Sequence, residues 1–91
     1  MSEVYTFPPN VQAREATMRE QAAKVMEEAS EVAEAAEGSD AGHIAREAWD
    51  VVQAAEGILR KLPADTVERA HADVMLRCSR RGDYGEISDI E

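Results

Sequence analysis

Three stretches of the chain alternate apolar and polar residues with the period of an α-helix. Residues 11–37 contain neither glycine nor proline, and their many strong helix formers predict one long helix. Residues 41–61 and 65–80 show the same helical period, and Pro63 separates them. The pattern therefore predicts an all-α fold, a helical bundle with three main helices.

The boundaries between these helices carry recognisable capping residues. Gly38, Ser39 and Asp40 form a turn, and Ser39 or Asp40 is expected to cap the second helix. Asp65 and Glu68 have the spacing of a capping box, which predicts that the third helix starts at Asp65.

Acidic residues interrupt the apolar faces of the first two helices. The expected inward stripe of the first helix is Met18, Ala22, Val25, Ala29, Val32, Ala33 and Ala36. Glu28 falls at the edge of this stripe, Glu31 lies further out, and Glu27 points away from it. Glu47 falls within the border of the second apolar stripe, with Asp50 beside it. A buried carboxylate is costly unless it is paired or bound to a metal, so Glu47 is the most informative position.

The spacing of these acids predicts a metal site between the two helices. Glu28 with Glu31, and Glu47 with Asp50, are three residues apart and share a helix face. Carboxylates gathered in this way repel one another unless a cation neutralises them, and oxygen ligands suit Mg²⁺, with Mn²⁺ as a further possibility. The alternative is two solvated acidic faces in an acidic chain. A di-iron site is disfavoured because neither pair contains a histidine.

Length and composition predict one small domain that assembles with copies of itself. The chain has 91 residues, and its 44% of hydrophobic residues are rich in alanine, with only four aromatic side chains. The expected organisation is an extended N-terminal arm at residues 1–10, a helical domain at 11–84 and a frayed tail at 85–91. A core this thin predicts completion by oligomerisation, as a homodimer or homotetramer.

The charge and composition of the chain limit the classes of binding partner and the cellular compartment that we expect. A formal net charge of −9 argues against binding to nucleic-acid backbones or anionic membranes. No apolar run approaches the roughly 20 residues of a membrane span. With one cysteine, Cys78, and no signal-peptide pattern, the expected location is the cytoplasm.

Basic and aromatic residues near the end of the third helix are candidate substrate contacts. Arg80, Arg81 and Tyr84 could hold a phosphate or a base, because arginine forks match phosphate oxygens. The alternative is that these cations stabilise a helix C-terminus. Lys24 lies one turn before Glu28, where it either pairs with that acid or contacts a phosphate.

The acidic pattern Glu27-Glu28-x-x-Glu31 followed by Glu47-x-x-Asp50 resembles the MazG-like nucleotide pyrophosphohydrolases. That family carries E-E-x-x-E, a spacer and E-x-x-D on an all-α fold, and the likeness extends over about residues 13–84. The chain is also similar to the related phosphoribosyl-ATP pyrophosphohydrolases. The resemblance implies that Glu28, Glu31, Glu47 and Asp50 bind magnesium. It implies that Glu27, with Glu28, serves catalysis by helping to bind metal or orient the attacking water.

The resemblance implies a Mg²⁺-dependent hydrolysis of a ribo- or deoxyribonucleoside triphosphate to the monophosphate and pyrophosphate. Two alternatives stay open: a phosphoribosyl-ATP pyrophosphohydrolase-like enzyme, or a non-catalytic helical module that binds a partner. The family's basic segment on the third helix matches loosely here, and Arg77, Arg80 and Arg81 are the candidates for its role. Trp49 or Tyr84 could stack on the base, with core packing or an interface as the alternative role.

Overall fold

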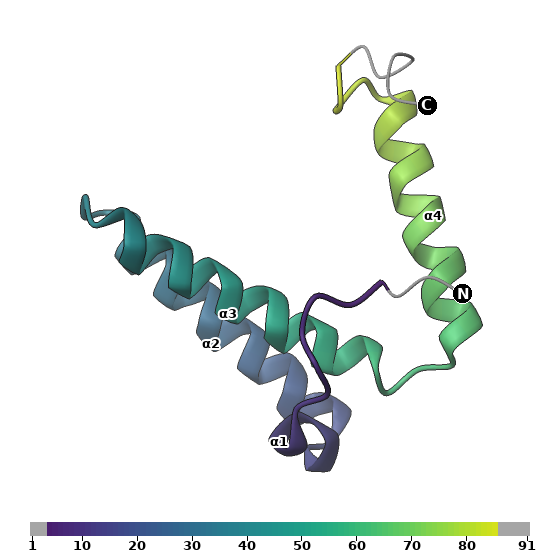
Figure 1. Cartoon of the computed structure of the whole chain (residues 1–91), viewed down its shortest axis with the longest axis horizontal. Coiled ribbons are helices and arrows are strands. Elements are labelled where there is room, and N and C mark those ends of the chain that lie inside the picture. Colours follow the sequence, from purple (N-terminus) through teal and green to yellow (C-terminus); the bar gives the residue numbers. More distant parts are fainter. Residues whose placement is uncertain (1–3, 86–91) are drawn as a thin grey trace. The chain divides into compact units, whose positions relative to one another are not determined.

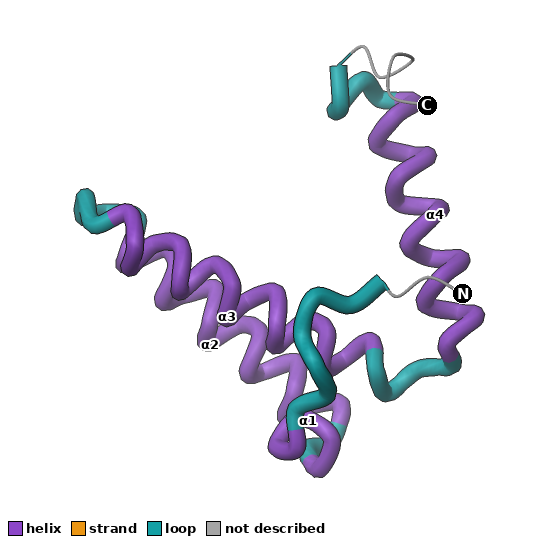
Figure 2. Tube along the Cα trace, in the orientation of Figure 1, coloured by secondary structure: helices purple, strands orange, loops and turns teal. Residues whose placement is uncertain are grey.

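The computed structural model describes residues 4–85, and all regular structure within them is helical (Figures 1 and 2). The helices are α1 (Val11–Glu15), α2 (Met18–Ala35), α3 (Ala41–Leu59) and α4 (Ala64–Arg80). The predicted all-α fold class is confirmed. Of the predicted tail, residues 86–91 lie outside the described residues, and the predicted domain boundaries and oligomer stay predictions. The chain divides into two compact units: Tyr5–Leu62 holds α1, α2 and α3, and α4 belongs to the other.

Helices α2 and α3 form an antiparallel hairpin and lie side by side along most of their length (Figure 1). Asp40 caps α3 as expected, because its Oδ1 accepts a hydrogen bond from the His43 N–H at 3.1 Å. The predicted second helix is therefore correct at its start, and it ends at Leu59 rather than at residue 61. This hairpin brings the two acidic segments face to face.

The single helix predicted over residues 11–37 is wrong, because the chain breaks between α1 and α2. Thr17 caps α2: its Oγ1 accepts from the Glu20 N–H at 3.0 Å, and the Glu20 carboxylate accepts from the Thr17 N–H at 2.9 Å. This reciprocal capping box satisfies two backbone donors locally. The hydrogen bonds of the box favour a new helix start over continuation of a helix that propensity alone would allow.

The buried face of α2 differs from the predicted alanine-rich stripe. Gln21, Glu28 and Ala35 are buried at seven-residue intervals, and Val25 and Val32 between them are half-buried. A repeat of seven keeps one face against a neighbouring helix, and here that neighbour is α3. Most of the predicted stripe is exposed, namely Met18, Ala22, Ala29, Ala33 and Ala36. Glu28 does face inward, as its angular position indicated.

Three helices converge at Gly57 of α3. A Cβ on this residue would lie 2.7 Å from Gln21 Nε2 and 2.8 Å from the Cβ of Ala13. The Gln21 Nε2 donates to the Ala54 carbonyl at 3.0 Å, which joins α2 to α3 inside the hairpin. Glycine at this position therefore lets α1 and α2 approach α3 closely.

The N-terminal arm is tied to α3 of the same chain from residue 5 onward. The Glu56 carboxylate accepts from the N–H groups of Thr6 and Phe7 at 2.7 and 3.0 Å. Arg60 donates to the Phe7 carbonyl at 2.9 Å, and its guanidinium lies 3.9 Å from the centre of the Tyr5 ring. Glu56 is buried, and its charge is stabilised by the two backbone donors of the arm.

Helix α4 starts one residue before the predicted position and without the predicted capping box. Its N-cap is Pro63, which makes no side-chain capping bond. The Asp65 carboxylate accepts instead from the adjacent Thr66 N–H at 2.9 Å. Proline fixes an extended entry to the helix, so the start at Ala64 is set by backbone geometry rather than by the acid pair.

Candidate metal centre

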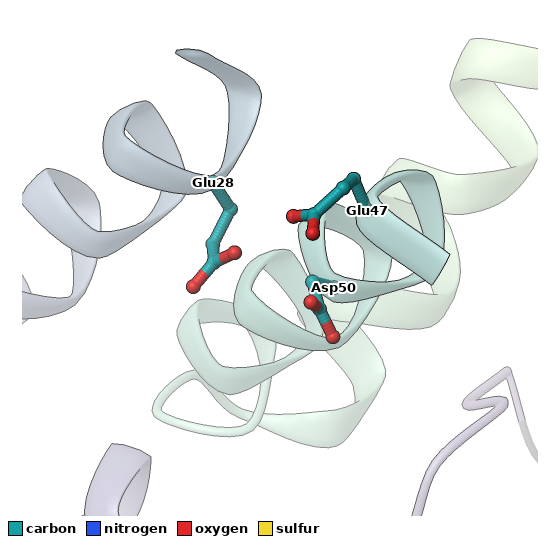
Figure 3. Close-up of side chains that lie close together, drawn as sticks. All are labelled: Glu28, Glu47 and Asp50. Atoms are coloured by element: carbon teal, nitrogen blue, oxygen red, sulfur yellow. The ribbon is translucent and has the colours of Figure 1, made fainter. Parts of the chain in front are cut away.

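Three carboxylates from the α2–α3 hairpin face the same space (Figure 3). Glu28 projects from α2, and Glu47 and Asp50 project from α3. One oxygen of each lies within 4.8 Å of the others. Acids three residues apart on α3 share a face. The buried face of α2, formed by Gln21, Glu28 and Ala35, places Glu28 opposite them. Acids from the two acidic segments therefore lie close together across the hairpin, as the sequence predicted.

Glu47 is the least satisfied of these acids. Its side chain is 19% exposed, and its Oε1 is buried without a hydrogen-bond partner among the described residues. Its Oε2 lies 3.3 Å from His43 Nε2, which attracts it only when the imidazole is protonated. An ionised oxygen buried without a partner is costly, and a cation at this point would satisfy it.

One lysine partly offsets the negative charge of the cluster. Lys24 Nζ lies 3.0 Å from Glu28 and 3.6 Å from Glu27. The hydrogen bond to Glu28 is the main reason that the pKa of Lys24 is raised. Three carboxylates beside one ammonium leave a surplus of negative charge, which a divalent cation would neutralise.

Glu31 lies beside the three acids but does not belong to the group whose oxygens all lie within 4.8 Å of one another. It is exposed on α2, and its pKa is raised first by the negative charge of Glu28, then by desolvation and by a hydrogen bond with Glu47. Glu27 is also exposed and pairs with Lys24. The roles predicted for Glu27 and Glu31 therefore stay predictions, whereas Glu28, Glu47 and Asp50 offer an oxygen-only donor set that fits Mg²⁺ or Mn²⁺.

A cleft of about 310 Å³ adjoins the acids within the same unit. Glu28 and Asp50 are among its lining residues, and Lys24 lines it as well. Its other polar lining residues are Asn10, Gln12, Glu20, Gln21 and Gln53. The volume is in the range of small-molecule sites, and neutral amides suit a polar, uncharged group such as a nucleobase.

The cleft amides and His43 were not among the predicted site residues. Gln21 lies seven residues before Glu28, and His43 lies four residues before Glu47, so helical spacing carried the signal in both cases. Asn10 and Gln53 are joined by a long hydrogen bond of 3.5 Å, from Asn10 Nδ2 to Gln53 Oε1. Only the fold reveals this contact, because the residues are far apart in sequence.

The remaining predicted substrate contacts lie elsewhere on the chain. The Trp49 ring packs edge-on against Phe7, with 5.8 Å between ring centres, and the residue is 52% exposed. In the unit that contains α4, a separate cleft of about 430 Å³ is lined by Asp73, Leu76, Arg77, Arg80 and Arg81. Tyr84 is beside Cys78, and a hydrogen bond with this thiol is the main cause of its raised pKa. Contact with a substrate stays a prediction for all the residues concerned, namely Trp49, Arg77, Arg80, Arg81 and Tyr84.

Over residues 2–71 the chain matches the family model described as phosphoribosyl-ATP pyrophosphohydrolase. The chain belongs to this family. Members of the phosphoribosyl-ATP pyrophosphohydrolase family are metal-dependent hydrolases that act on phosphoanhydride bonds, and the match confirms the superfamily that the two acidic motifs indicated. The MazG-like branch within that superfamily stays a prediction. Neither the curated proteins nor the solved structures gave a significant match.

The matched segment contains all the acids of the cluster and ends within α4. Within residues 4–85, none of the helices is both long and apolar enough to cross a membrane.

Proposed function

We propose that this protein is a Mg²⁺-dependent pyrophosphohydrolase that converts a nucleoside triphosphate-like substrate to its monophosphate and pyrophosphate. The observation that carries the proposal is the convergence of Glu28, Glu47 and Asp50, together with an oxygen of Glu47 that is buried without a hydrogen-bond partner among residues 4–85. These residues would hold Mg²⁺, and Mn²⁺ would be accepted by the same oxygens. The bound ion would neutralise phosphate charge and lower the pKa of a coordinated water.

The protein's own residues have distinct parts in this proposal. Glu28 and Glu47 are fixed by burial and by the packing of the hairpin, so their oxygens keep one geometry. Lys24 lies at the rim, where its ammonium can pair with a phosphate oxygen as well as with Glu28. The exposed side chains of Glu27 and Glu31 are free to turn toward the site, where one of them would orient the attacking water or accept its proton.

Two substrate classes fit this reaction. A ribo- or deoxyribonucleoside triphosphate is the class that the acidic motifs indicated. Phosphoribosyl-ATP is favoured by the family model that matches the chain. Both present a triphosphate to the acids and a base to the amide-lined cleft, so the site chemistry is common to the two.

We also propose that the active form is a homodimer or homotetramer in the cytoplasm, without nucleic-acid or membrane partners. Few apolar side chains are buried in the described part of the chain, whereas Met26, Trp49, Met75 and Leu76 are each at least half exposed. Large exposed apolar side chains are common at subunit interfaces. Light scattering would read the mass directly, and a monomer at micromolar concentration would contradict the proposed assembly.

The test of the activity is product analysis with Mg²⁺ and with a chelator. Standard ribo- and deoxyribonucleoside triphosphates and phosphoribosyl-ATP are supplied in turn, and pyrophosphate and monophosphate are quantified separately. We expect Mg²⁺-dependent release of pyrophosphate from at least one substrate, and loss of this release in Glu47→Gln. Release of inorganic phosphate alone, or equal activity with the chelator, would contradict the proposal.

A further inference from the structure

Helix α3 carries a nitrogen donor on the same side as Glu47 and Asp50. His43 lies four residues before Glu47 and seven residues before Asp50, so the three side chains share one side of the helix. His43 belongs to the first turn of α3, and Asp40 accepts a hydrogen bond from its backbone N–H. The helix therefore holds an imidazole beside the carboxylates to which we assign the metal.

The imidazole lies directly against Glu47. His43 Nε2 is 3.3 Å from Glu47 Oε2, and Glu47 Oε1 is buried without a hydrogen-bond partner among residues 4–85. A charge-assisted hydrogen bond would bring the nitrogen and the oxygen to about 2.7–2.9 Å. Adjacent ligands of an octahedral ion, with metal–ligand distances of about 2.1 Å, are about 3 Å apart. The observed separation is therefore long for an ion pair and compatible with two ligands of one ion.

A cleft of about 450 Å³ gives access to this contact, between the end of α2 and the start of α3. Its lining residues are Glu31, Glu34, Ala35, Gly38, His43 and Glu47, and none of them is a lysine or an arginine. Glu31 also interacts with Glu47 across the hairpin. A cation that reaches the imidazole thus meets negative charge, and no cationic side chain of the cleft competes with it.

An imidazole changes which cations a carboxylate site prefers. Mg²⁺ is bound mainly through carboxylate, phosphate and water oxygens, so a nitrogen donor adds little to its affinity. First-row transition-metal ions accept imidazole readily, and their affinity for a given site rises from Mn²⁺ through Co²⁺ to Ni²⁺. A mixed set of one nitrogen and several oxygens therefore separates the two classes of ion.

We propose that His43 is a specificity-determining residue of the metal centre, because its Nε2 ligates a divalent ion that Glu47 holds. It favours a first-row transition-metal ion over Mg²⁺. The inference rests on the proposed function for the position of the ion, and it adds that Mg²⁺ is not the ion that binds most tightly. If His43 acted only as a charge beside Glu47, its removal would affect all divalent ions alike.

The first experiment titrates Co²⁺ and Mg²⁺ separately into metal-free, full-length protein at mildly alkaline pH, where imidazoles are neutral, and measures the heat of binding. His43→Ala removes the ring and keeps the backbone N–H that Asp40 caps. We expect Co²⁺ binding to weaken at least about tenfold in this variant, and Mg²⁺ binding to change by less than about twofold. His71→Ala removes the other histidine, which is exposed on α4, and should bind both ions like the wild type.

The second experiment identifies the donor atom by NMR of the Co²⁺-loaded protein. Imidazole resonances of a ligating histidine are shifted far from their usual positions by the paramagnetic ion. We expect such resonances in the wild type and in His71→Ala, and their loss in His43→Ala. Their absence from the wild type, or their persistence in His43→Ala, would overturn the inference. Equal weakening of Co²⁺ and Mg²⁺ binding in His43→Ala would overturn it as well.

The two proposals can fail separately. If Mg²⁺ supports pyrophosphate release and Co²⁺ binding does not need His43, the reaction stands and the inference is refuted. If Co²⁺ binding needs His43 but no nucleotide is hydrolysed with either ion, the reaction is lost and His43 stands as a metal ligand. No binding of either ion to folded wild-type protein would overturn both.

Discussion

The buried oxygen of Glu47 links the stability of the apo protein to its function. Replacing Glu47 by Gln keeps the shape of the side chain and removes a charge that lacks a full set of partners. We expect the free energy of unfolding of metal-free protein to rise by about 1 kcal/mol, because an unpaired buried charge is destabilising. Urea denaturation with a chelator, at a pH where His43 is neutral, measures the change.

A matched control is Glu37→Gln, which removes an exposed acid from the end of the hairpin. Its free energy of unfolding should stay within about 0.5 kcal/mol of the wild type. A Glu47→Gln protein that is less stable than the wild type without metal would show that Glu47 already has a satisfactory partner.

Glu31 makes the stability of the metal-free protein depend on pH. Because its pKa is raised, mainly by the charge of Glu28, the folded protein holds this proton more tightly than the unfolded chain does. The resulting contribution to stability is complete below the ordinary pKa of a glutamate. It is lost as the pH rises through the raised pKa of the folded state. We expect Glu31→Gln to flatten the fall in melting temperature between acidic and neutral pH; the same slope in both proteins would contradict this.

At the scale of helices, the packing at Gly57 positions the amide-lined cleft. A methyl group there would meet Gln21 and Ala13 at distances shorter than real Cβ contacts, so the helices would have to move apart. We expect Gly57→Ala to destabilise the fold by about 1–2 kcal/mol, since overpacking outweighs the gain in helix propensity. Gly42→Ala on the same helix is the control, because its Cβ would make ordinary contacts at 3.5 Å.

Urea denaturation of both glycine variants separates packing from propensity. The control should be unchanged or more stable, because alanine is the better helix former. If Gly57→Ala were also as stable as the wild type, the close approach of α1 and α2 to α3 would not be tightly packed in solution.

Helical periodicity predicted the parts of the site that depend on one helix at a time. It placed Glu28 inward and Glu47 at a poorly solvated position because each angle is set by the regular turn of its own helix. It failed at Thr17, where a capping box overrides continuous helix propensity. It also placed alanines rather than Gln21 on the buried face of α2. The position of the partner helix, and not apolarity alone, determines which residues of α2 are buried.

Contacts between distant segments could not be predicted from spacing. The sequence left base stacking, core packing or an interface open for Trp49. The N-terminal arm contacts the face of α3 that holds Trp49, Glu56 and Arg60, through Phe7 and its neighbours. A cleft lined by Arg14, Arg60 and Lys61 likewise forms only when α1 folds back beside the end of α3.

On the scale of the molecule, the unit Tyr5–Leu62 separates opposite charges along one hairpin. The acids lie toward the middle of α3, the cations collect at its C-terminal end, and amides line the space between. The central requirement of this arrangement is that the three acids bind a divalent cation.

Calorimetric titration of Mg²⁺ into metal-free protein tests that requirement most directly. We expect saturable binding to the wild type, retention of this binding in Glu37→Gln, and at least about tenfold weaker binding in Glu47→Gln, since one ligand of the set is lost. Binding of equal strength in Glu47→Gln, or no Mg²⁺ binding to folded wild-type protein, would contradict the assignment of Glu28, Glu47 and Asp50 as the metal centre.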